Sequence, residues 1–243
     1  MFKENVVALL CHYLKGVTYW MKIYLGSEQW ISEELRQRCN RVEPATIGHY
    51  LTTGFMHPRI KSVLEGVHIV GQALTVSISA DDSVMVHKAV SMVQEGEIIV
   101  IDRLGDGVHA CVGEMVVYAA KERKAAGIII DGPSTDVQAM RELGVPVFST
   151  GFSPITTKLR GHSGEINTTI HCGGVVVKPG DLIIADDNGV LVIPKNFPDL
   201  DELLLKAETG EKREAELKKK IDNGETLSSL THADQILKEH GIL

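Results

Sequence analysis

Two acidic residues, Glu114 and Asp136, stand near the starts of two predicted helices and are the first candidates for chemistry in this chain. Glu114 follows Gly113, and the apolar residues after it recur at helical spacing, which places Glu114 in the first helical turn. Unpaired backbone N–H groups and the positive end of the helix dipole stabilise negative charge at that position. The favoured carboxylate is either the side chain's own or that of a bound anionic substrate.

The segment between these acids is predicted to be a helix, a buried strand and a turn into the second helix. Gly127 is expected to end the first helix, and Ile128–Ile130 forms the strand. Asp131-Gly132-Pro133 then turns the chain, so that the second helix starts near Ser134 with Asp136 in its first turn. A buried strand and a glycine-bearing loop precede the unit, and this crossover pattern favours parallel strand pairing.

The rest of the chain alternates between strand and helix patterns. The strand expected at 67–79 shows a period of two, which predicts one buried face. Asp186-Asp187-Asn188-Gly189 is a strong hairpin signal, and turn chemistry alone explains its two acids. Further helices are expected at 32–40, 44–50, 84–93, 199–223 and 227–237, and further strands at 97–102, 145–148, 166–170, 175–177, 182–185 and 190–193.

Composition excludes several classes of protein. With 243 residues, 44% of them hydrophobic and 23% charged, the chain is long enough for one large globular domain with appended helices. A net charge of −7 argues against a nucleic-acid surface, which needs a basic patch. Four cysteines without a CxxC pair suggest neither a zinc site nor disulfides, so we expect a reducing cytoplasm.

The first thirty residues are the least typical part of the sequence. Their apolar run is interrupted by His12, Lys15 and Lys22 before it reaches the length of a membrane span. No small-residue cleavage site follows, so a signal peptide is not expected either. We predict an extra helix that packs on the domain or on a neighbouring subunit, and Met21 is an alternative natural start.

Glu114, twenty intervening residues and then Thr135-Asp136 resemble the acidic-X20-Arg-Asp signature of the RraA-like proteins. That family includes the class II 4-hydroxy-4-methyl-2-oxoglutarate aldolases and the regulator of ribonuclease E activity A. The resemblance runs from about Arg41 to Pro194 and includes, in family order, the segments EGEIIVID, GIIIDGPSTDV, GVPVFSTG, CGGVVVKPGD and ADDNGVLVIP.

The resemblance implies an α/β fold, the layered swivelling β/β/α sandwich of the family. The expected organisation is an N-terminal extension over 1–30, the RraA-like domain over 31–196 and helices over 197–243 that pack on the domain or a neighbouring subunit. Family members form trimeric rings, or hexamers of two rings, with sites at subunit boundaries. The resemblance therefore implies a homotrimer or hexamer, with neither nucleic acid nor membrane as a partner.

The resemblance also implies roles for the residues of the central unit. Asp136 matches the family's metal ligand, and one carboxylate plus waters and substrate oxygens suits Mg2+ or Mn2+. Glu114 would orient or deprotonate a metal-bound water that carries a proton. The family's arginine is Thr135 here, so the charge that helps to hold the substrate oxyanion is missing. The backbone expected to cradle the substrate is that of Gly113, Glu114, Met115 and Val116.

Basic residues elsewhere are candidates to replace the missing charge. Lys158 and Arg160 lie in a polar, glycine-bearing loop of the kind that is often functional, and Lys178 follows a strand. His49 stands where the family often has an acid. For the loop residues the alternative is solvated surface charge, and for His49 it is a packed or surface histidine.

The favoured function is a divalent-metal-dependent lyase that acts on a small 2-oxo acid by retro-aldol cleavage or β-decarboxylation. Both reactions leave a pyruvate-like enolate, which a metal stabilises as a Lewis acid. The alternative is a non-catalytic ring that regulates a protein partner, as the ribonuclease E regulator does. Without the resemblance, helix capping alone would explain both acids. Methyl transfer is disfavoured because no glycine-rich cofactor loop is evident.

Overall fold

The computed structural model describes residues 6–14 and 17–243. By its internal contacts the chain divides into two units, residues 1–198 and 199–243.

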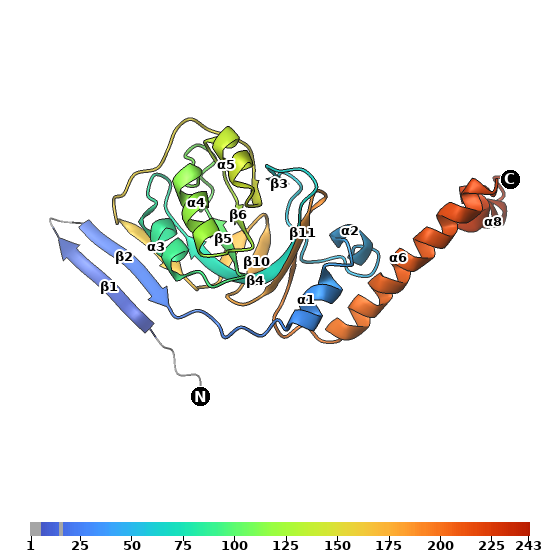
Figure 1. The fold of residues 1–243 in the computed structure, drawn as a ribbon, viewed down its shortest axis with the longest axis horizontal. Helices are drawn as coiled ribbons and strands as arrows, with labels where there is room; N and C mark the ends of the chain where they lie inside the picture. Colours follow the sequence, from blue (N-terminus) through green and yellow to red (C-terminus); the bar gives the residue numbers. More distant parts are fainter. Residues whose placement is uncertain (1–5, 15–16) are drawn as a thin grey trace. The chain divides into compact units, whose positions relative to one another are not determined.

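Parallel strands form the middle of the main sheet of the first unit (Figure 1). They are β4 (His68–Ser77), β5 (Ile98–Asp102), β6 (Gly127–Ile130) and β7 (Val147–Ser149). Each pairs in parallel with the next, because a helix carries the chain back between every two strands. The predicted parallel crossovers are therefore confirmed. The two-residue β3 (Lys61–Ser62) is antiparallel to β7 at the edge.

The three crossover helices cover one face of this sheet (Figure 1). They are α3 (Val84–Met92), α4 (Glu114–Glu122) and α5 (Val137–Leu143). Each supplies an apolar stripe, such as Val86, Val117 and Met140, that packs with strand residues including Ile99 and Ile128 in one buried cluster. This burial is the main stabilising term for short helices of this kind.

More strands cover the opposite face. They are β9 (Ile170–Cys172), β10 (Val175–Val177), β11 (Leu182–Asp186) and β12 (Gly189–Ile193). Ile170 and Ile183 share a second buried cluster with Val100, Ile129 and Phe148 of the main sheet. Strand, strand and helix layers thus follow one another, and the predicted β/β/α sandwich is confirmed. The expected hairpin is also present, with Asp186 paired to Gly189.

β4 corrects one expectation, because it is buried on both faces rather than one. It lies between β5, β11 and β8 (Ser163–Ile166), so even its polar residues are enclosed. Thr75 Oγ1 donates to the Thr168 carbonyl at 2.6 Å, and Gln72 Nε2 donates to Glu97 Oε1 at 3.3 Å. Hydrogen bonds of this kind offset the cost of burying polar groups.

The expected N-terminal helix is wrong. The described part of this region is a hairpin of β1 (Val6–Leu14) and β2 (Val17–Tyr24), and β2 pairs in parallel with β8. Met21 and Ile23 pack against the core, whereas the alternate residue Lys22 forms an ion pair with Glu165 at 3.2 Å. This period of two is that of a strand. The alternative start at Met21 falls within β2.

Two helix boundaries also differ from the sequence expectations: α4 ends before Gly127, and α5 begins at Val137 rather than near Ser134. α4 ends at Glu122 rather than at Gly127, because Lys124 adopts a left-handed conformation with φ of 56°. Gly127 instead opens β6, where a Cβ atom would lie 2.6 Å from Ile69 Cδ1. The helix α1 (Glu33–Cys39) is as expected, and the side chain of Ser32 caps it by accepting from the Leu35 N–H at 3.1 Å.

The second unit is helical, as predicted. Its long helix is α6 (Leu200–Asp222), and the final helix expected at 227–237 is two helices, α7 (Leu227–Leu230) and α8 (Ala233–Glu239). His232, with φ of 61°, breaks them apart. Among the described residues no helix is long and apolar enough to cross a membrane.

Candidate functional site

A hollow of about 270 Å³ opens at the carboxyl ends of β5 and β6, beside the start of α4. Ligand sites of parallel α/β sheets lie at this edge. Five of the six residues predicted for the site line it: Gly113, Met115, Val116, Thr135 and Asp136. The remaining lining residues are Ser83, His87, Ala110, Cys111, Thr156, Thr157, Lys158 and Leu159.

One hydrogen bond joins the two halves of the predicted site. Asp136 Oδ2 accepts from the backbone N–H of Glu114 at 3.0 Å, so the carboxylate caps the start of α4. Gly113 makes this approach possible, since a Cβ atom there would overlap Asp136 Oδ2 and lie 2.8 Å from Thr135 Cγ2. The structure therefore brings the carboxylate of Asp136 to the backbone of Glu114.

Asp136 is held in an unusual backbone conformation. Its φ of 55° and ψ of 44° are left-handed, which costs a residue other than glycine roughly 1 kcal/mol or more. It stands at the N-cap of α5, yet its side chain caps α4 and makes no cap hydrogen bond to its own helix. The adjacent Thr135 N–H donates to the Val112 carbonyl at 3.0 Å and fixes this turn against the start of α4.

The Glu114 side chain is placed differently from its backbone. It is exposed and is not among the residues that line the hollow. Its role in proton transfer stays a prediction. Within residues 6–14 and 17–243, no three His, Cys, Asp or Glu side chains are grouped to hold a metal ion. Asp136 is thus the one acidic side chain that the lining contributes.

The opposite wall is a strap, residues 156–162, held by backbone hydrogen bonds. Thr157 N–H donates to the Ala110 carbonyl at 3.1 Å, and Lys158 N–H donates to the Asp81 carbonyl at 2.7 Å. The Asp82 carboxylate, 1% exposed, accepts from the N–H groups of Arg160 and His162 at 3.2 and 2.7 Å. Burial raises the pKa of Asp82, but the hydrogen bonds from the Val84 N–H and from the strap outweigh it and hold the pKa below the usual value.

Of the basic candidates, Lys158 alone lines the hollow. Arg160 forms an ion pair with Asp81 at 2.6 Å, and Lys178 is not part of the lining. His49 is exposed, makes an edge-on contact with Tyr50 and does not line the hollow either. The larger hollow of about 540 Å³ near α2 (Pro44–Ile47) contains no charged lining residue, so we do not assign chemistry to it.

His87 and Cys111 are among the lining residues that were not predicted from the sequence. His87 is one of three polar residues of α3, with Lys88 and Ser91, so the sequence did not single it out. Its position depends on α3 packing beside α4, which no local pattern encodes. Cys111 is 5% exposed, and burial raises the pKa of its thiol to about 11. It therefore remains a neutral thiol at neutral pH.

Comparisons with known proteins agree with this fold. The RraA-like family model, described as Aldolase/RraA, matches residues 44–192. A protein of Halalkalibacterium halodurans named "putative 4-hydroxy-4-methyl-2-oxoglutarate aldolase" is 41% identical over 136 residues, which cover 56% of this chain and 64% of that relative. The match thus spans slightly less than two thirds of that relative. An uncharacterized protein of Methanocaldococcus jannaschii is 34% identical over 72% of this chain and 84% of its own length.

A solved structure is similar as well. Streptomyces coelicolor RraAS2, described as an unusual member of the RNase ES inhibitor RraA protein family, superposes with a TM-score of 0.68 at 28% identity. The superposition covers 79% of this chain and 98% of that one.

Gly113→Ala tests the contact between the turn and α4. We expect it to lower the free energy of unfolding by about 1–3 kcal/mol, because the new Cβ atom displaces the Asp136 carboxylate. Hydrogen exchange at the Glu114 amide should accelerate in the same variant. Gly107→Ala is the control, since no atom lies within 4 Å of a Cβ there. Equal urea denaturation midpoints for the two variants would contradict the contact.

Asp82→Asn tests the strap. Because the pKa of Asp82 is lowered on folding, its stabilisation is present above the unfolded value of 3.8 and is lost as pH falls through the lower folded value. At pH 7 we expect the substitution to cost on the order of 1–3 kcal/mol, and the cost should shrink below pH 3.8. Urea denaturation at pH 7 and pH 3, with Glu122→Gln as an exposed control, measures this. A cost independent of pH would argue against the carboxylate's role.

Proposed function

Because the chain belongs to the RraA-like (Aldolase/RraA) family, we propose that it is a divalent-metal-dependent lyase. Its substrate would be a small 2-oxo acid, and the reaction retro-aldol cleavage or β-decarboxylation through a pyruvate-like enolate. The observation that supports this most is the hollow in which the Asp136 carboxylate meets the start of α4. One binding region there combines a fixed negative charge with backbone donors for an anion.

The start of α4 would bind the substrate carboxylate. N–H groups of a first helical turn have no carbonyl partner within their own helix. That of Glu114 donates to Asp136, whereas Met115 and Val116 line the hollow and would direct their N–H groups to the substrate. The helix dipole adds to the attraction. The substrate anion would thus bind where α4 begins.

The donor set at Asp136 fits a magnesium or manganese ion. Oδ2 accepts from the Glu114 N–H, which leaves Oδ1 to coordinate a cation. Mg2+ commonly takes one or two protein carboxylates and completes its shell with waters and substrate oxygens. When bound, the cation would supply Lewis-acid stabilisation of the charge that develops on the substrate's 2-oxo oxygen.

The remaining residues would bind the substrate and move protons. In the retro-aldol reaction a base removes the proton of the substrate's 4-hydroxyl group, and the electrons of the C3–C4 bond pass into the enolate. A proton delivered to C3 then gives the pyruvate product. Glu114 would orient or deprotonate the water molecule that carries this proton. Lys158 would attract a second carboxylate of the substrate from the strap.

Assembly is part of the proposal. By similarity to the family we propose a homotrimer or a hexamer, in which a neighbouring copy completes the open side of the hollow. Specificity contacts would then come partly from that copy. Sedimentation of the purified chain measures the assembly directly.

The second candidate function is a non-catalytic ring that regulates a protein partner. The similarity to the Streptomyces coelicolor protein, which is described as a member of an RNase ES inhibitor family, favours this alternative. A net charge of −7 suits a partner with a basic segment.

Pyruvate release from oxaloacetate discriminates the two functions. With Mg2+ or Mn2+ the lyase should release pyruvate, and a chelator should abolish the reaction. Asp136→Asn should lower turnover at least about 100-fold because the metal ligand is lost, while Glu122→Gln at the far end of α4 should leave it unchanged. No release with any metal, together with a co-purifying protein, would favour the regulator.

Thr135 determines the expected preference among substrates. A hydroxyl donates one hydrogen bond and lacks the charge and the bidentate geometry of arginine. Loss of one such donor costs on the order of 100-fold to 1,000-fold in turnover, so activity on 4-hydroxy-4-methyl-2-oxoglutarate should be weak or absent. Thr135→Arg should raise it. A folded, metal-binding variant that shows no gain would count against this account of the site.

A further inference from the structure

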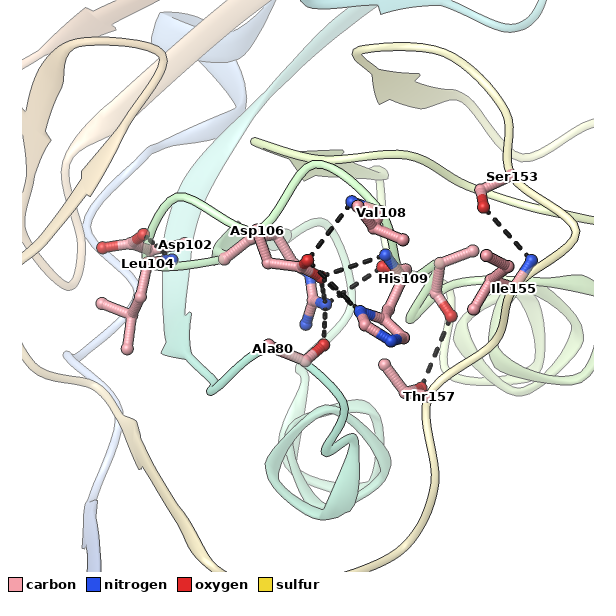
Figure 2. Close-up of polar contacts among 11 residues, drawn as sticks. Ala80, Asp102, Leu104, Asp106, Val108, His109, Ser153, Ile155 and Thr157 are labelled. Atoms are coloured by element: carbon pink, nitrogen blue, oxygen red, sulfur yellow. Dashed lines mark hydrogen bonds and ion pairs between the residues drawn. The ribbon is translucent and has the colours of Figure 1, made fainter.

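Arg103, directly after β5, is a buried cation that is only partly hydrogen bonded. Its side chain is 0% exposed, and its hydrogen bonds to oxygen atoms leave from one nitrogen. Nη2 donates to the Ala80 carbonyl, to Asp106 Oδ2 at 2.6 Å and to the His109 carbonyl at 3.0 Å (Figure 2). In the described part of the chain, Nε and Nη1 are buried and have no hydrogen-bond partner. Buried donors are rarely left unsatisfied, because desolvation is costly.

The ion-pair partner of Arg103 does not neutralise it fully. Asp106 meets the guanidinium through Oδ2 alone, and it also accepts from the N–H groups of Val108 and His109 and from His109 Nδ1 (Figure 2). Burial raises the pKa of Asp106, but the hydrogen bonds from His109 and Arg103 lower it by more, so the pKa is below its usual value. Asp106 is therefore ionised at neutral pH. Its negative charge is thus shared among several donors, on one side of the guanidinium.

The rest of the Arg103 side chain is close to the wall of the hollow. Burial raises the pKa of the Cys111 thiol, which lines the hollow, while the charge of Arg103 and a hydrogen bond from its side chain lower it. The Cγ atom of Arg103 lies 2.7 Å from where a Cβ atom would stand at Gly132, in the turn that leads to Thr135 and Asp136. Arg103 therefore stands behind the hollow, between Cys111 and the β6–α5 turn.

We propose that Arg103 is a positioning residue that makes this hollow attractive to anions, through its buried charge and without touching the substrate. The inference rests on the proposed function for the identity of the anion, a carboxylate or enolate of a 2-oxo acid. A fully buried charge is screened less than an exposed one, so its field reaches across one layer of side chains. Lys158, by contrast, is exposed and is screened by solvent. The wall residue Thr135 is neutral, and the charge is supplied from behind it.

A purely structural role for Arg103 is the alternative. Through Nη2 it ties the loop after β5 to Ala80 and His109, and this would anchor the loop whatever the hollow binds. The two roles differ in what happens when Asp106 loses its charge. If Arg103 is an anchor, loss of the Asp106 charge weakens its hold on the loop. If Arg103 attracts the anion, the same loss leaves its positive charge less compensated and so strengthens the attraction.

Oxalate, a stable analogue of the pyruvate enolate, is the probe. Its affinity is measured by calorimetry at pH 7.5 with Mg2+ present, on the full chain and on folded variants checked by circular dichroism. Arg103→Met should weaken binding about tenfold, because a partly compensated buried charge is removed. Asp106→Asn should tighten binding severalfold, because Arg103 loses its counter-charge while the new side-chain amide keeps an acceptor oxygen.

The opposite signs test the proposal. If both variants weaken binding, or if neither changes it, Arg103 is only an anchor and the proposal is overturned. Arg103→Lys should weaken binding less than Arg103→Met, since a lysine can carry the positive charge but lacks the planar guanidinium. Lys124→Met, which removes an exposed cation paired with Glu95, should have no effect. If Arg103→Met does not fold, Asp106→Asn decides, and a fall in affinity there overturns the proposal.

The experiment separates this inference from the proposed function because oxalate binding needs no turnover. If the two variants change oxalate affinity in opposite directions but the protein cleaves no 2-oxo acid, the role of Arg103 is supported and the lyase is refuted. If the protein cleaves a 2-oxo acid and both variants change oxalate affinity in the same direction, the lyase is supported and the role of Arg103 is refuted.

Discussion

The candidate site depends on one hydrogen bond, between the Asp136 carboxylate and the Glu114 N–H. It joins the turn after β6 to the start of α4, and it requires the missing side chain of Gly113 and the left-handed backbone of Asp136. A charge-assisted bond of this kind is stronger than a neutral one and helps to offset the strain of that backbone. One carboxylate oxygen is thereby fixed at a helix terminus, while the other remains for a ligand.

The parallel sheet explains why these groups meet. β5 and β6 are neighbours, so the loops at their carboxyl ends emerge side by side although Glu114 and Asp136 are 22 positions apart. The strap at 156–162 then closes the opposite side, because the Asp82 carboxylate accepts hydrogen bonds from N–H groups of the strap. Of the residues that line the hollow, Thr135 is neutral and Lys158 is an exposed cation, while the buried Arg103 lies outside the lining.

Much of the architecture was predictable from the sequence, and the departures have physical reasons. The crossover strands and helices follow from local apolar periodicity and glycine turns, and the Asp186–Gly189 hairpin follows from its turn residues. The N-terminal hairpin was missed because its strand character depends on pairing with β8, more than 140 positions away. β4 is buried on both faces for a similar reason, since its neighbours are distant in sequence. Gly113 and Asp136 could be predicted as site residues from the sequence. The left-handed φ of Asp136, the position of His87 in the lining and the burial of Arg103 could not, because they arise from tertiary packing.

The central claim is that the Asp136 carboxylate and the start of α4 together form a site for a metal ion and a small carboxylate. A crystal structure of the protein soaked with Mn2+ and oxalate tests it most directly, because anomalous scattering locates the metal. We predict manganese at Asp136 Oδ1, with an oxalate oxygen on the N–H groups of Met115 and Val116. Manganese and oxalate bound elsewhere, with the Asp136 carboxylate still engaged by Glu114 alone, would contradict the account.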